Sequence, residues 1–148
     1  MNNHVDTDSH SPTSVLDVLV IGGGAAGLAG ATTLARARQA VLVIDAGQPR
    51  NGPAAGVHSF LGHEGRPPTE LLALGRRELE GYGGKVVEGV AATARRQPDS
   101  LFEVVLEDGR HLRARRLLVT TGLRDVLPVV PGIEARFGDG RASCRERV

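Results

Sequence analysis

The residues that decide the fold are 17–27, which read DVLVIGGGAAG. Residues 16–21 form a short apolar run rich in β-branched side chains, which is typical of a strand buried on both faces of a parallel sheet. Glycines follow this run, and residues 22–27 satisfy the pattern G-x-G-x-x-G. The stretch therefore predicts a buried strand that ends in a tight glycine turn.

The residues after the glycine turn complete a larger unit. Residues 25–38 are rich in alanine, with Leu28 and Leu34 among small side chains, and they predict a helix. Residues 41–44 form a second short apolar run, which Asp45 follows directly. A strand, a helix and a strand within about thirty residues predict a βαβ unit with a right-handed crossover.

Each glycine of the turn has its own expected task. Gly22 permits the tight turn, Gly24 lets a pyrophosphate approach the backbone, and Gly27 lets the helix pack closely on the sheet. The helix N-terminus offers unpaired N–H groups to the phosphates. Asp45, about twenty residues on, is placed to accept a hydrogen bond from a ribose 2′-hydroxyl, and its charge disfavours the 2′-phosphate of NADP. The alternative is a glycine turn without a ligand, and the motif alone does not separate FAD from NAD.

The rest of the chain predicts a different continuation from that of a plain dehydrogenase. Thr69 is expected to cap a helix that Gly83 and Gly84 end, and Asp108-Gly109 signals a hairpin turn. A hairpin followed by a last buried strand makes an antiparallel meander, whereas a plain nucleotide-binding domain continues β-α-β-α, so the meander favours FAD. The expected elements are a loop at 47–68, a helix at 69–82 and strands at 85–90, 102–106, 111–116 and 117–120.

Composition and charge limit the class of protein. The chain has 148 residues, of which 41% are hydrophobic, so we expect one globular domain. The formal net charge is +1 and the basic clusters are not interleaved with aromatic residues, so we expect neither nucleic-acid nor membrane binding. Residues 1–14 are polar and residues 138–148 are basic without periodicity, which predicts a disordered leader and an irregular basic tail.

Cysteine usage and the amino terminus indicate the compartment. Cys144 is the single cysteine, which excludes an intramolecular disulfide. No basic segment followed by an apolar segment marks a signal peptide at the amino terminus. We therefore expect a cytoplasmic protein.

Several motifs together resemble a known family. Residues 17–27, the strand end at Asp45 and residues 118–122 (LVTTG) resemble the FAD domain of thioredoxin-reductase-like pyridine nucleotide–disulfide oxidoreductases. Residues 49–51 (PRN) and 58–62 (HSFLG) are similar to the bacterial branch of this group. The resemblance implies an α/β, Rossmann-like FAD-binding domain, with a parallel sheet flanked by helices and a small antiparallel β-meander.

The resemblance also implies FAD as the cofactor and a set of residues that bind it. Asp45 would hold the adenosine ribose, Val90 would meet the adenine through its backbone, and the amide of Asn51 would lie along the cofactor. For Val90 the alternative is a core residue, and for Arg50 it is a solvated loop charge. The complete set is Gly22, Gly24, Ala25, Ala26, Gly27, Asp45, Ala46, Arg50, Asn51, Val90, Thr120, Thr121 and Gly122.

The carboxyl-terminal part departs from the family pattern. Such enzymes pass electrons from NAD(P)H to FAD and then to a Cys-x-x-Cys pair, which exchanges with a thioredoxin-like or small dithiol partner. Cys144 falls near the first cysteine of that pair, but Arg147 stands where the second is expected, and no second G-x-G-x-x-G follows. We therefore expect an incomplete FAD-binding domain at residues 15–137, from a truncated or frameshifted gene product, without a catalytic residue or a metal site. The resemblance also suggests a homodimer.

Other functions compete with the flavoenzyme interpretation. One is a non-catalytic fragment that binds FAD or ADP. A short-chain dehydrogenase needs Tyr-x-x-x-Lys one helical turn apart, and Tyr82 and Lys85 are one residue too close. In the long loop, His58 and His63 are expected at the surface rather than beside a flavin.

Overall fold

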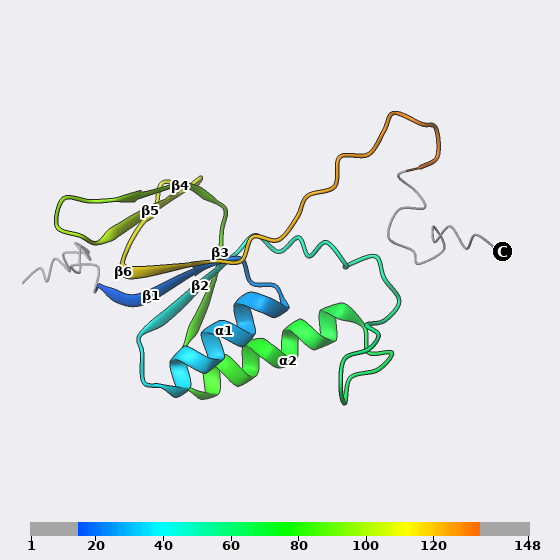
Figure 1. The fold of residues 1–148 in the computed structure, drawn as a ribbon, viewed down its shortest axis with the longest axis horizontal. Coiled ribbons are helices and arrows are strands. Elements are labelled where there is room, and N and C mark those ends of the chain that lie inside the picture. Colours follow the sequence, from blue (N-terminus) through cyan, green and yellow to red (C-terminus); the bar gives the residue numbers. More distant parts are fainter. Residues whose placement is uncertain (1–14, 134–148) are drawn as a thin grey trace, which may run out of the picture.

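A computed structural model describes residues 15–133 of the chain (Figure 1). The predicted leader, the predicted tail, residues 134–137 and Cys144 lie outside these residues. Of the helices within residues 15–133, none is long and apolar enough to cross a membrane. The elements in chain order are β1 (Leu16–Ile21), α1 (Ala25–Arg36), β2 (Val41–Asp45), α2 (Pro68–Gly81), β3 (Lys85–Glu88), β4 (Ala91–Arg96), β5 (Phe102–Leu106) and β6 (His111–Val119).

The strands form one six-stranded sheet with the order β3-β2-β1-β6-β5-β4. Strands β3, β2, β1 and β6 pair in parallel, whereas β5 and β4 continue the sheet in antiparallel pairing. This arrangement confirms the predicted α/β fold, in which β4, β5 and β6 make the antiparallel meander. The predicted βαβ unit is the succession of β1, α1 and β2.

Strand β6 joins the two parts of the sheet. The sequence predicts two strands, at 111–116 and 117–120, but His111–Val119 is one continuous strand. Its first part pairs with β5, with Ala114 opposite Phe102, and its second part pairs with β1, with Val119 beside Ile21. The two parts of the strand have different neighbours, so the sequence pattern changes within it. That change predicts a boundary between two strands, although the backbone continues without a break.

Different elements cover the two faces of the parallel strands. On one face, α1 packs against β1 and β2, and α2 packs against α1 and β3, with Val18 and Leu79 buried in the same core cluster. On the other face, the β4–β5 hairpin folds back, so that Val104 and Leu106 cover Leu19. Figure 1 shows the helices on one side of β1 and the hairpin on the other. The meander therefore takes the place of a second helical layer.

Element boundaries differ from the predicted ones for local reasons. Helix α2 begins at Pro68, so Thr69 lies in its first turn and is not the predicted cap. Proline suits the first helical position because its φ is fixed and an N–H there has no helical partner. Helix α1 ends at Arg36 rather than at residue 38, because Arg38 has a left-handed φ of 64°. Strand β3 ends at Glu88, two residues before the predicted end.

The sequence does not predict β4. Its residues, AATARR, have low β-propensity and do not alternate, and most of them are exposed. The segment is a strand because β5 pairs along it, with Arg96 opposite Phe102. Pairing with a neighbouring strand thus overrides the local preference.

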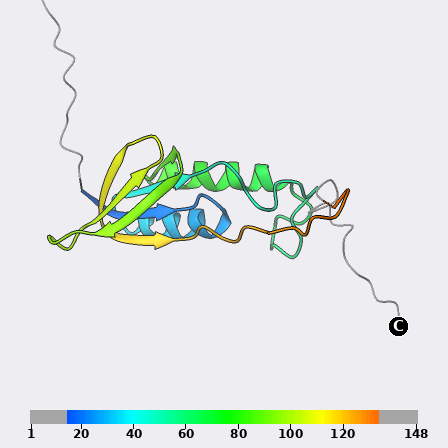
Figure 2. The ribbon, with the colours of Figure 1, turned by 90° about the horizontal axis from the view of Figure 1, so that it is seen from above.

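The carboxyl ends of three parallel strands meet at one edge of the sheet. Ile21 of β1 is in register with Ile44 of β2 and Val119 of β6, so the residues that follow these strands come together. Loop 46–67 and segment 120–133 both extend beyond this edge (Figure 2). Open α/β sheets bind their ligands at such an edge, so the candidate functional site is expected there.

Candidate functional site

The glycine turn is packed so closely that at two of its positions backbone atoms leave no room for a side chain, and at Gly23 the Asp45 side chain leaves none. Gly22 has a φ of 109°, and a Cβ there would lie 2.4 Å from the carbonyl oxygen of Thr120. A Cβ on Gly27 would lie 1.9 Å from the carbonyl oxygen of Gly22. A Cβ on Gly24, by contrast, would meet nothing within 4 Å. The fold of the turn therefore requires Gly22 and Gly27, whereas Gly24 leaves open space in front of the backbone.

The start of α1 presents unused backbone donors at this space. The first bond of the helix runs from the N–H of Leu28 to the carbonyl oxygen of Gly24, at 2.9 Å. The N–H groups of Ala25 and Ala26 precede this bond and have no helical acceptor. The first turn contains no acidic residue, and no side chain caps the helix. An anion would find free donors and the positive end of the helix dipole here.

Asp45 lies directly beside the glycine turn. A Cβ on Gly23 would come within 2.5 Å of the Asp45 Cγ, so the side chain rests against this glycine. Asp45 Oδ1 accepts a hydrogen bond from the N–H of Gly47 (3.0 Å), and Oδ2 accepts one from the guanidinium of Arg76 on α2. The Asp45 side chain is 14% exposed. The sequence does not reveal Arg76, because it lies 31 residues away on another element and no motif links the two.

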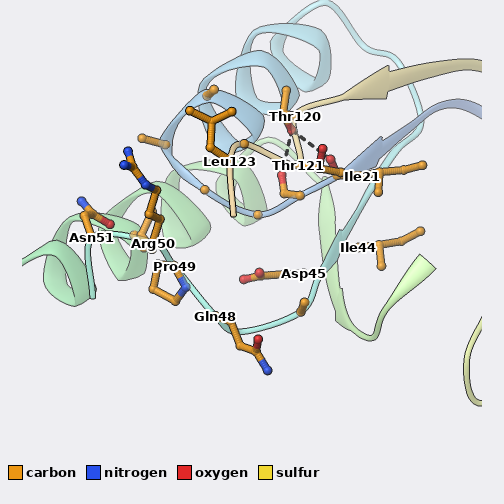
Figure 3. A pocket seen from close by; sticks show the side chains of 18 of the residues that line it. Ile21, Ile44, Asp45, Gln48, Pro49, Arg50, Asn51, Thr120, Thr121 and Leu123 are labelled. Carbon is orange, nitrogen blue, oxygen red and sulfur yellow. Dashed lines mark hydrogen bonds between the residues drawn. The ribbon is translucent and has the colours of Figure 1, made fainter. Parts of the chain in front are cut away.

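Thr120 ties β6 to the turn. Its N–H donates to the carbonyl oxygen of Ile21 (2.9 Å), and its hydroxyl lies 2.9 Å from the Gly22 carbonyl oxygen and 3.1 Å from that of Ile21 (Figure 3). A hydroxyl carries one proton, so it donates to one of these oxygens at a time. The hydroxyl of Thr120 is therefore committed to holding the turn in place.

A cavity of about 390 Å³ opens at this edge of the sheet (Figure 3). The predicted site residues all line it except Gly27, which is buried under the turn. Gly23 and Pro49 also line it, and the motifs around them could have identified both. The remaining lining residues outside the predicted set are Ile21, Ile44, Gln48, Pro68, Leu71, Leu72, Gly89, Ala91 and Leu123.

Arg50 and Asn51 line the end of the cavity that loop 46–67 forms. The guanidinium of Arg50 donates two hydrogen bonds to the carboxylate of Asp125, at 2.6 and 2.8 Å. The hydrogen bond between these side chains is the main reason why the pKa of Asp125 is lowered and the pKa of Arg50 is raised. Arg50 is thus exposed but paired, and the pair connects loop 46–67 to the segment that follows β6.

Val90 lies between β3 and β4 and is 41% exposed. The interpretation of Val90 as a core residue is therefore wrong. Its carbonyl oxygen accepts a hydrogen bond from the N–H of Glu107 (2.9 Å), whereas within residues 15–133 its own N–H has no backbone acceptor. The backbone of Val90 thus offers a donor at the cavity wall.

The histidines of the loop and the single tyrosine lie away from the cavity lining. His58 is exposed and hydrogen-bonded to Glu64 at 2.7 Å. His63 lines a second, smaller cavity of about 270 Å³ between the loop and the two helices. Tyr82 follows the last turn of α2 and Lys85 begins β3, so the two do not share a helical turn. A short-chain dehydrogenase site therefore finds no support.

Curated proteins similar to this chain are redox enzymes. The chain is 33% identical over 137 residues to thioredoxin reductase tcpT of Claviceps purpurea, and the match covers 90% of this chain and 43% of that protein. It is 27% identical over 139 residues to a thioredoxin reductase of Aquifex aeolicus, with 90% and 42% covered. The chain therefore spans about two fifths of the length of these relatives.

Solved structures and a family profile agree with this similarity. The crystal structure of HlmI has a TM-score of 0.81 and 44% identity, over 84% of this chain and 40% of that chain. An oxidoreductase from Agrobacterium tumefaciens has a TM-score of 0.76 and 40% identity, over 82% and 41%. The family model described as pyridine nucleotide-disulphide oxidoreductase matches residues 16–147. With its glycine turn, its acidic strand end and this match over most of its length, the chain belongs to the pyridine nucleotide-disulphide oxidoreductase family.

Proposed function

We propose that this chain binds FAD in the cavity at the glycine turn. Residues 15–137 are then the flavin-binding part of an NAD(P)H-dependent oxidoreductase of the thioredoxin-reductase-like group. The observation that carries the proposal is the open space at Gly24. This space belongs to one cavity that the N-terminus of α1 and Asp45 also line.

The lining residues fit the parts of an adenine dinucleotide. The N–H groups of Ala25 and Ala26 suit a diphosphate, the carboxylate of Asp45 suits a ribose hydroxyl, and the N–H of Val90 suits an edge of adenine. The charge of Asp45 disfavours a 2′-phosphate, which argues against NADP at this position. The meander in place of a further helical layer, together with membership of the family, favours FAD over NAD.

The contribution of this chain to the reaction is binding and orientation. FAD, when bound, supplies the hydride and electron chemistry. The ionisable side chains of the cavity lining are Asp45 and Arg50, and each is engaged in an ion pair. The lining residues therefore hold the cofactor with backbone donors and one carboxylate, and none of them is free to act as a general acid or base.

The proposal is tested by loading the purified full chain with FAD and adding NADPH or NADH in the absence of oxygen. We expect saturable flavin binding, followed by bleaching of the visible flavin band. Gly24→Val is the matched variant, because it fills the space proposed for the diphosphate and its Cβ would meet no atom within 4 Å. It is expected to lower the affinity for FAD by roughly tenfold or more and to leave the melting temperature nearly unchanged.

A second candidate function is a chain that binds FAD or ADP without turnover. The observation that favours it is the single cysteine, because one cysteine cannot form a dithiol pair within this chain. In that case bound flavin keeps its colour in the presence of NAD(P)H but is bleached by chemical reduction. The same anaerobic titration therefore separates the two functions.

A thioredoxin-like protein or a small dithiol is the proposed electron acceptor. The curated relatives named thioredoxin reductases support this choice. A homodimer and a cytoplasmic location complete the proposal, and the formal net charge of +1 supports no nucleic-acid or membrane partner. Sedimentation velocity with and without FAD tests the homodimer.

A further inference from the structure

Arg76 makes a contact that the glycine motif does not require. It lies on α2, and its guanidinium forms an ion pair with Asp45 at the end of β2. Core packing holds α2 in place, because Leu79 is fully buried and a Cβ on Gly75 would lie 3.2 Å from Leu28 of α1. The ion pair therefore joins two elements whose positions the core already determines.

The pair fixes the direction in which the Asp45 carboxylate points. Oδ2 accepts from Arg76, and Oδ1 accepts from the N–H of Gly47 at 3.0 Å. Bonds to both oxygens restrict rotation of the carboxylate, while a carboxylate has about four acceptor positions, so some stay available for a sugar hydroxyl. Arg76 is not among the residues that line the cavity, so its effect on the orientation of a ligand there passes through Asp45.

The positive charge of Arg76 also affects the electrostatics of the site. A carboxylate that is 14% exposed, next to the proposed diphosphate position, places like charges close together in a partly dehydrated site. Glu88 lies opposite Asp45 in the register of β2 and β3 and adds to the local negative charge. Among the described residues, Arg76 is the cation that pairs with Asp45. It offsets the charge that a diphosphate would otherwise meet.

We infer that Arg76 is the positioning residue that sets the ribose specificity of this site. By holding the Asp45 carboxylate in one orientation beside Gly23, it makes the site prefer nucleotides with a ribose 2′-hydroxyl over their 2′-deoxy forms. The inference rests on the proposed function, because it requires the adenosine half of a dinucleotide to bind at the glycine turn.

The experiment compares ADP with 2′-deoxy-ADP as competitors that displace FAD from the full chain. A hydrogen bond to a charged group contributes enough to predict that the wild-type chain prefers ADP by roughly tenfold or more. Arg76→Met is expected to reduce this preference to less than about threefold. Arg77→Met is the matched control, because Arg77 is the exposed neighbour on the same helix, and it is expected to keep the wild-type ratio.

A double substitution separates positioning from a general structural effect. Asp45→Asn is expected to lower the ratio by itself, and adding Arg76→Met to it is expected to lower the ratio no further, because Arg76 acts through Asp45. Circular-dichroism melting checks that each variant folds. If Arg76→Met does not fold, Arg76→Ala, which also removes every side-chain donor, is measured instead with the same expected ratio.

The possible negative results distinguish a wrong binding site from a wrong role for Arg76. If ADP does not displace FAD from the wild-type chain, the proposed function is wrong. If the wild-type chain prefers ADP and the Arg76 variant prefers it equally, the binding site stands and the role of Arg76 is overturned. A further drop in the double variant also overturns it, because Arg76 would then act independently of Asp45.

Discussion

The two ends of the cavity are formed by different kinds of contact. At the turn end, backbone atoms approach so closely that a Cβ on Gly27 would lie 1.9 Å from the Gly22 carbonyl oxygen. At the loop end, the exposed side chain of Arg50 and the half-buried side chain of Asp125 form an ion pair at the surface, with exposures of 56% and 27%. Contacts between buried backbone atoms cannot adjust to added volume, whereas an exposed ion pair can open and close at little cost. The turn end should therefore resist substitution, and the loop end should tolerate it.

The largest effect is expected for Gly27→Ala. The added Cβ overlaps a backbone oxygen that cannot move without shifting the turn, so we expect a loss of about 3 kcal/mol in the free energy of unfolding. Chemical denaturation measures it. Gly81→Ala is the matched control, because a Cβ there meets nothing within 4 Å. An equal loss in both variants would contradict the account of the turn.

The next largest effect is expected for Gly24→Val, and it should appear in binding rather than in stability. The side chain enters open space, so the free energy of unfolding should change by no more than about 1 kcal/mol. It fills the position proposed for the diphosphate, so the affinity for FAD should fall by roughly tenfold or more. Flavin fluorescence titration and thermal melting together check this split. A variant that binds FAD normally would show that the diphosphate lies elsewhere.

A smaller effect is expected for Thr120→Val. The variant keeps the shape of the side chain but loses the hydroxyl that donates to the carbonyl oxygens of the turn. One such hydrogen bond contributes about 1 kcal/mol to stability. Denaturant unfolding measures this loss, and Thr121→Val is the control, since no side-chain hydrogen bond within residues 15–133 involves Thr121. A variant as stable as the wild type would mean that β6 is not tied to the turn through this hydroxyl.

The smallest effect is expected for Arg50→Met at the loop end. The pair lies at the surface, so we expect only a small fall in melting temperature at neutral pH. The pKa of Asp125 is lowered by its hydrogen bond from Arg50, so any stabilisation by the pair is present above the ordinary carboxyl pKa and disappears as pH falls through the lowered value. Comparing the melting temperatures of wild type and variant across acid pH checks this. A large loss at neutral pH would show that the loop end is as rigid as the turn end.

The same contrast explains how far the sequence predicts the fold. Buried elements whose pattern is local, such as β1, β2 and the helices, are predictable because hydrophobic runs and glycines mark them directly. Strand β4 is not, because its alanines and arginines become a strand through pairing with β5. The continuity of β6 is also hidden, because one strand serves two different neighbours.

The candidate site follows the same division. Gly22, Gly24 and Asp45 stand out because a diphosphate and a ribose need these residue types at this spacing. Arg76 and Asp125 do not stand out, because each reaches the site from an element far away in the sequence. Side chains that position a motif residue from another element depend on tertiary packing, which no local pattern records.

The central claim is that the adenosine diphosphate half of FAD binds at the glycine turn. It is tested most directly by titrating the full chain with FAD and then adding ADP or FMN as a competitor. The account predicts that ADP displaces FAD from a single site and that FMN, which lacks the adenosine diphosphate half, does not. Binding of FMN as tight as that of FAD, or FAD that ADP cannot displace, would contradict it.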